Sequence, residues 1–170
     1  MASEYLIEGR ERGSTSLRLV QSGVLGDNWE TEYEAMAVGW DMYLGTLAAY
    51  LAHFSGRTAT PVSAFRPGVG GADRAWAAVA DAFGVAGPLA EGDRVRFTVA
   101  GLPPIEGVVD LAGLPTYAGV RTPDALYRFL HSGAERGDAL VLGHHVFAVG
   151  QDPAQAERAW QDWLNALPLG

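Results

Sequence analysis

The longest continuous pattern in the sequence is an amphipathic helix predicted from Asn28 to Phe54. Large apolar side chains recur in this segment every three or four residues, which places them on one face of a helix. They are Trp29, Tyr33, Met36, Trp40, Leu44, Leu47, Leu51 and Phe54. At 1.5 Å per residue, such a helix is roughly 40 Å long. We therefore expect it to lie across a sheet or another helix, because its apolar stripe needs a long partner.

Residues at both ends of this segment support a helix with these limits. Asp27 and Glu30 have the spacing of a capping box, in which side chains satisfy free backbone N–H groups of the first turn. Gly56 follows the segment, and glycine often ends a helix because it adopts the left-handed conformation. Upstream, Glu4–Glu11 and Ser16–Val24 have strand patterns on either side of a turn. A β-hairpin is therefore predicted before the helix.

The remainder of the chain predicts a strand, a helix, a series of strands and a closing helix. The first strand and helix are expected at Thr58–Phe65, where Pro61 suggests a sheet edge or a strand start, and at Ala72–Phe83. Asp152 and Pro153 are the residue types of a helix N-cap and first helical position, so they begin the closing helix. Between the helix at Ala72–Phe83 and the closing helix lie strand candidates, each bounded by Gly, Pro or Asp, as in an antiparallel meander. They are Arg94–Val99, Gly107–Leu111, Tyr117–Arg121, Ala125–His131 and Ala139–Val149.

Composition limits the classes of function. The 170-residue chain carries a net charge of −8, and its 12 basic residues are all Arg, scattered singly. Nucleic acids and anionic membrane surfaces need clustered basic residues, so neither is an expected partner. The absence of Cys excludes disulfides, thiolate metal sites and cysteine nucleophiles. The sequence shows neither a signal peptide nor an apolar stretch of bilayer length, which predicts a soluble, cytoplasmic protein.

Two segments in which a strand precedes a helix share their spacing of apolar residues. The matched positions keep a constant offset of 120 residues, as between Trp40 and Trp160. The full set is Trp40, Tyr43, Leu44 and Leu47, matched by Trp160, Trp163, Leu164 and Leu167. The helices are either an internal repeat or two unrelated amphipathic helices. A repeat predicts that residues 57–170 form a whole unit and residues 1–56 only the final strand and helix of another.

A string of motifs in the first 56 residues resembles a known superfamily. The string is Leu17–Gly23, Trp29-Glu30, Tyr33-Glu34, Gly39–Leu44 and Leu47. It is similar to the C-terminal end of SRPBCC (START/Bet v 1-like) domains, in the branch of homologues of the activator of Hsp90 ATPase. Residues 57–170 resemble a second, degenerate copy. A complete domain has further strands and a helix before this ending, so we expect either that the chain is a truncated form or that residues 1–56 dock on the second unit or on another protomer.

The resemblance implies an α+β fold of the helix-grip type. In such a fold an antiparallel sheet wraps around a long C-terminal helix and leaves an apolar cavity; the N-terminal hairpin and long helix are additional here. The implied function is noncatalytic binding of a small apolar ligand, without metal or cofactor. The expected ligand-binding residues are Tyr33, Trp40, Tyr43, Tyr127 and His144. Ordinary core packing is the alternative role for each of them.

Two other functions stay open at this point. The first is a protein-interaction or chaperone-related module that self-associates through its partial unit and forms a homo-oligomer. The second is an enzyme of the polyketide-cyclase type, which would use Tyr127 and His144 in a polar cavity. A fold alone does not decide between these functions.

Other polar groups in the sequence are better explained by ordinary structure. His144 and His145 are adjacent on a predicted strand, so their side chains point to opposite faces and no shared metal site is expected. One imidazole should be internal and hydrogen-bonded, and the other should face water. Gly68–Gly71 precedes a helix but has no P-loop lysine, so a plain turn is favoured over an anion site. Two pairs of carboxylates are expected at solvated strand ends rather than as acid/base groups: Glu106 with Asp110, and Glu91 with Asp93.

Overall fold

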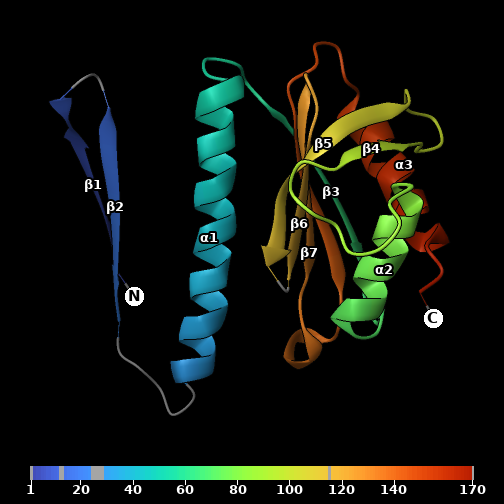
Figure 1. Ribbon diagram of the computed structural model, residues 1–170, viewed down its shortest axis with the longest axis horizontal. Helices are drawn as coiled ribbons and strands as arrows, with labels where there is room; N and C mark the ends of the chain where they lie inside the picture. Colours follow the sequence, from blue (N-terminus) through green and yellow to red (C-terminus); the bar gives the residue numbers. More distant parts are fainter. Residues whose placement is uncertain (1, 12–13, 24–28, 115, 170) are drawn as a thin grey trace. The chain divides into compact units, whose positions relative to one another are not determined.

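The computed structural model describes residues 2–11, 14–23, 29–114 and 116–169 of a mixed α+β chain (Figure 1). The chain divides into two compact units, Met1–Ala37 and Val38–Gly170. The division falls inside the long helix α1 (Trp29–His53), whose second part belongs to the second unit. The prediction that residues 1–56 and 57–170 are related units stays a prediction.

The first unit contains the predicted hairpin. Strands β1 (Ala2–Gly9) and β2 (Thr15–Ser22) are antiparallel, and Tyr5 lies opposite Leu19 as Ile7 lies opposite Leu17. Because side chains alternate along a strand, these four apolar residues share one face of the hairpin. The predicted capping residue Asp27 lies outside the described residues.

The second unit contains a six-stranded antiparallel sheet. Five of its strands form the predicted meander, and the first strand returns to pair with the last, giving the order β3-β8-β7-β6-β5-β4. Pro61 is on an edge strand, one of the two predicted positions, where its missing N–H costs no ladder hydrogen bond. The strands are β3 (Thr60–Arg66), β4 (Arg94–Phe97), β5 (Ile105–Leu114), β6 (Tyr117–Arg121), β7 (Ala125–His131) and β8 (Leu140–Val146).

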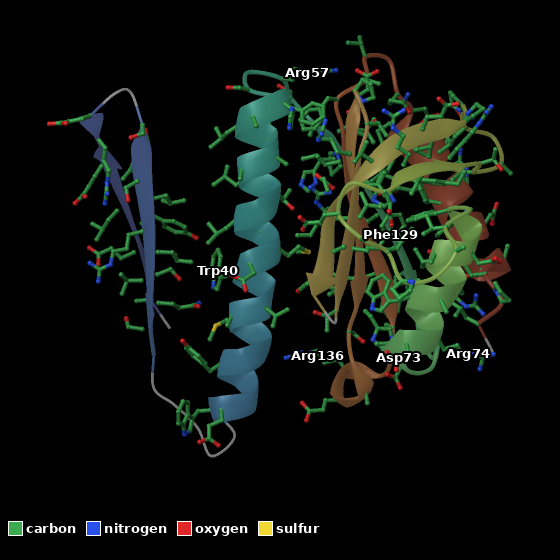
Figure 2. All side chains as sticks on the ribbon, in the orientation of Figure 1. Trp40, Arg57, Asp73, Arg74, Phe129 and Arg136 are labelled. Atoms are coloured by element: carbon green, nitrogen blue, oxygen red, sulfur yellow. The ribbon has the colours of Figure 1, made fainter. Side chains whose placement is uncertain are left out.

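Helices α2 (Ala72–Ala82) and α3 (Pro153–Ala166) lie on one face of this sheet (Figure 1). The predicted cap of α3 is confirmed, because Asp152 Oδ1 accepts hydrogen bonds from the N–H groups of Ala154 and Gln155 at 3.0 and 3.3 Å. Apolar side chains fill the layer between sheet and helices (Figure 2). Trp160 of α3 is fully buried there, with its ring 6.0 Å from that of Phe129.

The second part of α1 lies on the opposite face of the sheet. The helix does not dock through its apolar stripe, so that prediction is wrong. The side of the helix toward the sheet is built from small residues: a Cβ on Gly39 would lie 3.7 Å from the Tyr117 hydroxyl, and one on Gly45 would lie 3.7 Å from Leu111. Most of the predicted stripe is instead exposed, including Leu44, Leu47 and Leu51. The helix docks through its small residues rather than its large ones, because small residues let the helix backbone approach the sheet closely.

Among the described residues, aromatic stacking on this face occurs at the end of α1. Phe54 stacks on Phe147 with ring centroids 4.2 Å apart, and Tyr50 stacks on the same ring at 5.9 Å. Phe54, Leu126 and Phe147 form a small core of their own. The helix ends as predicted before Gly56, which has a φ of 81°.

Candidate functional site

A cavity of about 790 Å³ lies between α2 and the ends of β5 and β6. We call it the α2 cleft. Small-molecule sites usually have volumes of roughly 300–1,000 Å³ and mainly apolar walls with a few polar groups. The α2 cleft has this size and this type of lining. Its described lining residues are Asp73, Trp76, Ala77, Ala80, Asp81, Val85, Ala86, Gly87, Pro88, Leu89, Ala112, Gly113, Tyr117 and Ala118.

Short side chains make the α2 cleft hollow. Half of the residues just named are alanine or glycine. On α2 itself, Ala77 and Ala80 stand beside the half-buried Trp76. Longer side chains at these positions would occupy part of the space beside Trp76, so the short residues keep the cleft open.

Two carboxylates stand at the edge of the α2 cleft. Asp73, Ala77 and Asp81 follow one another at intervals of four residues and therefore share one face of α2. Both aspartates are exposed, and Figure 2 shows Asp73 at the start of the helix. Among the described lining residues there is neither Lys nor Arg. The cleft is therefore an apolar space with a negative rim.

His144, a predicted ligand-binding residue, is buried between β8 and α3. Its Nδ1 accepts a hydrogen bond from the backbone N–H of Arg128 at 3.1 Å. The proton of the neutral ring is therefore on Nε2, which has no hydrogen-bond partner among the described residues. The ring stands edge-on to Trp160 at a centroid distance of 4.3 Å. Burial lowers the pKa of His144 to about 3, with the charges of His145 and Arg128 adding to the effect, so the imidazole stays neutral at physiological pH.

Tyr127 is the predicted residue that the structure places next to His144. Their rings lie 5.0 Å apart in an edge-to-face arrangement. Burial raises the pKa of Tyr127 to about 12, and the charge of Asp124 contributes. Tyr127 and Trp160 also line a smaller cavity of about 400 Å³ between the sheet and the start of α3.

The other three predicted ligand-binding residues do not join this pair. Trp40 and Tyr43 lie on α1, on the other side of the sheet, with ring centroids 6.1 Å apart. Trp40 is half-buried and Tyr43 is 61% exposed. Tyr33 belongs to the first unit and is also exposed. The structure thus places Tyr127 beside His144 on one side of the sheet and Trp40 beside Tyr43 on the other, rather than all five residues in one site.

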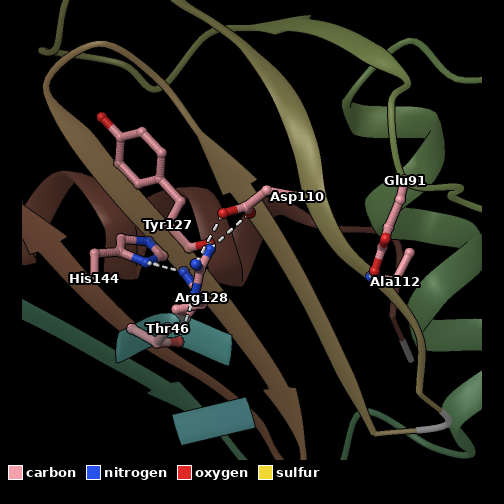
Figure 3. A network of polar contacts seen from close by, with 7 residues as sticks. All are labelled: Thr46, Glu91, Asp110, Ala112, Tyr127, Arg128 and His144. Carbon is pink, nitrogen blue, oxygen red and sulfur yellow. Dashed lines mark hydrogen bonds and ion pairs between the residues drawn. The ribbon is translucent and has the colours of Figure 1, made fainter. Parts of the chain in front are cut away.

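A buried ion pair lies on the α1 face of the sheet (Figure 3). The guanidinium of Arg128 donates from Nη1 and Nη2 to the two carboxylate oxygens of Asp110, at 2.9 and 3.0 Å. Its Nε donates to the Thr46 hydroxyl of α1 at 2.9 Å. The side chains of Arg128 and Asp110 are only 4% and 12% exposed. The expectation that Asp110 is solvated is therefore wrong, because strand pairing brings β7 within reach of β5 across β6.

Gly119 provides the space for this ion pair. A Cβ at Gly119 would lie 2.5 Å from Arg128 Nη1, 2.8 Å from the Leu111 Cβ and 2.9 Å from Asp110 Oδ1. The missing side chain lets the guanidinium lie against Gly119 of β6 and reach Thr46 of α1. Arg128, Asp110 and Thr46 are thus satisfied by one another, which indicates a structural role in docking α1.

The remaining polar groups act as parts of turns and surfaces. Val69 in the Gly68–Gly71 loop donates its N–H to the Asp138 carbonyl at 2.8 Å, which fits the predicted turn. Glu106 pairs with Arg96 at 3.2 Å on the exposed face. His145 is half-buried rather than solvated as expected, and burial lowers its pKa.

Within the described ranges, no cluster of His, Asp and Glu has the arrangement of a metal site, and no helix is long and apolar enough to cross a membrane.

Sequence reasoning missed the residues of the α2 cleft. The signal was present in α2, where alanines surround Trp76, but a tryptophan on an amphipathic helix is read as core. Comparison with known proteins adds no assignment, because no family model, curated protein or solved structure matches the chain.

Proposed function

We propose that this protein binds a small, largely apolar molecule in the α2 cleft, without catalysing a reaction. The observation that carries the proposal is a cavity of about 790 Å³ whose walls are mostly short or apolar side chains beside Trp76. We also propose that residues 57–170 form a degenerate helix-grip domain of the SRPBCC type. Its support is the antiparallel sheet with α3 packed on one face, together with the resemblance of the sequence.

The rim of the α2 cleft selects the charge of the ligand. Asp73 and Asp81 present negative charge at the edge of an apolar space. An anionic ligand, such as a fatty acid, would have to bring its carboxylate close to these groups, and like charges repel. We therefore expect neutral or cationic apolar ligands to bind better than anionic ligands of the same shape.

Catalysis by the predicted pair is not supported by their electrostatics. An acid/base residue works best when its pKa lies near the working pH. Burial shifts the pKa of His144 to about 3 and that of Tyr127 to about 12, so both groups keep one protonation state near pH 7. A polyketide-cyclase-type reaction is therefore the weaker proposal.

A cavity-filling variant tests the binding proposal. Ala77 is exposed and lines the cleft, so Ala77→Phe places a ring in the space while the core stays intact. Ala154→Phe is the matched control, because Ala154 is an exposed helical residue in α3 that lines neither described cavity. We expect the wild type and Ala154→Phe to enhance the fluorescence of the neutral probe N-phenyl-1-naphthylamine, and Ala77→Phe to lose at least about tenfold in affinity, since filling the site removes apolar contacts.

The charge of the ligand gives a second readout of the same site. Within a panel of neutral, cationic and carboxylate compounds that share one apolar skeleton, the carboxylates should displace the probe least. Asp81→Asn should reduce that difference. Equal probe affinity for the wild type and Ala77→Phe would show that the probe binds elsewhere, and absence of binding by every compound would refute the proposal.

A further inference from the structure

The side of α1 that faces away from the sheet carries an exposed apolar stripe. We define the α1 stripe as Tyr43, Leu44, Leu47 and Leu51, with the half-buried Trp40 at its start. Tyr43 and Leu51 are 61% and 59% exposed, and Leu44 and Leu47 are more than one third exposed. Figure 2 shows Trp40 on the side of the helix away from the sheet. The stripe lies opposite the small residues that dock α1.

The spacing of the α1 stripe is that of a helix-pairing seam. Trp40, Leu44, Leu47 and Leu51 are separated by four, three and four residues. This alternation matches the two core positions of a heptad, which face a second helix in a coiled coil. A seam of this kind is complementary to another helix rather than to a compact small molecule. It is also complementary to itself, as an interface between identical chains requires.

The charge distribution favours a second copy as the partner of this stripe. The chain has a net charge of −8, so two copies repel each other over most of their surfaces. The segment Met42–Ala52 contains no charged residue at all. Two identical surfaces meet there without like charges facing each other. The segment also carries no charge with which to select an acidic or basic partner.

We propose that the α1 stripe pairs with the α1 stripe of a second copy in an antiparallel arrangement. Antiparallel pairing places Trp40 of one chain near Leu51 of the other, and Leu44 near Leu47. It also moves the two Asp41 side chains to opposite ends of the contact, whereas parallel pairing would bring them together. The two chains are therefore related by a two-fold axis that passes close to the middle of the stripe.

The length of the stripe predicts a weak dimer. From Trp40 to Leu51 the helix rises only about 16 Å, which is short compared with an interface of about 800 Å² per partner. We therefore expect a dissociation constant on the order of 100 µM, so association must be measured at high concentration.

Sedimentation equilibrium of the whole chain, from about 10 µM to 1 mM, tests the proposal. The apparent mass should rise with concentration from 18.0 kDa toward twice that value. Leu51→Glu should weaken association at least about tenfold, because it places a charge in the apolar seam. Ala52→Glu is the matched control: the same residue is introduced one position along, exposed but off the stripe, and association should be retained. Circular dichroism checks that both variants stay folded.

Cysteine cross-linking tests the orientation, since the native chain contains no Cys. An equimolar mixture of Trp40→Cys and Leu51→Cys should form mainly the mixed disulfide when oxidised. Self-linked products alone would overturn the antiparallel pairing. A mass of one chain throughout the concentration range, as would follow if the β1–β2 hairpin covered the stripe instead, would overturn the dimer. A dimer that Leu51→Glu leaves unchanged would overturn the assignment to this surface.

Discussion

The two faces of the six-stranded sheet hold their helices in different ways. On the α3 face, large side chains interlock: Trp160 is fully buried and its ring contacts those of Phe97, Phe129 and Tyr127. On the α1 face, small residues of the helix approach the sheet, and an arginine–carboxylate pair replaces most of the apolar contacts. One sheet thus supports a close-packed aromatic layer and a polar one. The two layers should respond differently to the same kinds of substitution.

The largest expected losses come from one residue on each face, and the first of these residues is on the aromatic face. Trp160→Ala should lower the free energy of unfolding by about 3–5 kcal/mol, because it removes a fully buried ring and leaves a cavity. Trp163→Ala is the matched comparison, since Trp163 lies in the same cluster but is only half-buried. Its loss should be clearly smaller. Urea unfolding of both variants measures the difference, and equal losses would contradict the assignment of Trp160 to the centre of the core.

On the polar face, the arginine pair should behave as a unit. Arg128→Met should also cost about 3–5 kcal/mol, because it leaves the Asp110 carboxylate buried without a partner. The double variant Arg128→Met with Asp110→Leu should recover most of this loss, since no uncompensated charge then remains. A double-mutant cycle in urea measures the coupling. Additive effects would show that the two side chains do not depend on each other.

Sequence patterns predicted the strands and helices better than the faces through which they dock. Tyr117–Arg121 and Ala125–His131 are strands with the predicted limits, and Asp152 caps α3 as predicted, because turn and cap residues act locally. The face by which α1 docks was not predictable from the periodicity of its large apolar residues. That periodicity marks the apolar positions, whereas Gly39, Gly45 and Thr46 decide how closely the helix approaches the sheet.

Prediction of the candidate sites from the sequence was harder, because these sites form only when strands that are distant in the sequence pair with one another. Arg128 and Asp110 are on β7 and β5, and only the register of both strands with β6 places them together. The α2 cleft combines residues of α2, a loop and two strands, so no single segment shows it. Tyr127 and His144 came together because β7 and β8 are neighbours in the meander.

A comparison of two glycine substitutions tests the space beneath Arg128. The expected loss of stability at Gly119 is intermediate in size. Gly119→Ala should cost about 1–3 kcal/mol, because its Cβ would collide with Arg128 Nη1 and with the Leu111 Cβ, which belongs to a neighbouring strand. Gly143→Ala on β8 is the control, since a Cβ there meets nothing within 4 Å. Its effect should stay within about 0.5 kcal/mol. Thermal unfolding compares the two, and a tolerated Gly119→Ala would mean that the guanidinium has room to move.

A dependence on pH that belongs to the α3 face is expected to change the free energy of unfolding by about 1.4 kcal/mol between pH 7.5 and pH 5.5. In the folded chain the pKa of His144 is lowered to about 3, whereas an unfolded histidine titrates near its ordinary value of 6.5. Below that value the unfolded state binds a proton that the folded state does not bind. Stability from this group is therefore complete above about pH 6.5 and is lost toward pH 3, by at most about 1.4 kcal/mol per pH unit.

The variant His144→Asn separates the contribution of His144 to the pH dependence of stability from that of the other titrating groups of the chain. Asparagine keeps an acceptor for the Arg128 N–H and removes the titration. It should lower stability at pH 7.5, because a smaller side chain packs less well against Trp160. Between pH 7.5 and pH 5.5, however, its free energy of unfolding should fall less than that of the wild type. Urea unfolding at both pH values gives the comparison, and parallel losses would mean that the imidazole accepts a proton without leaving the core.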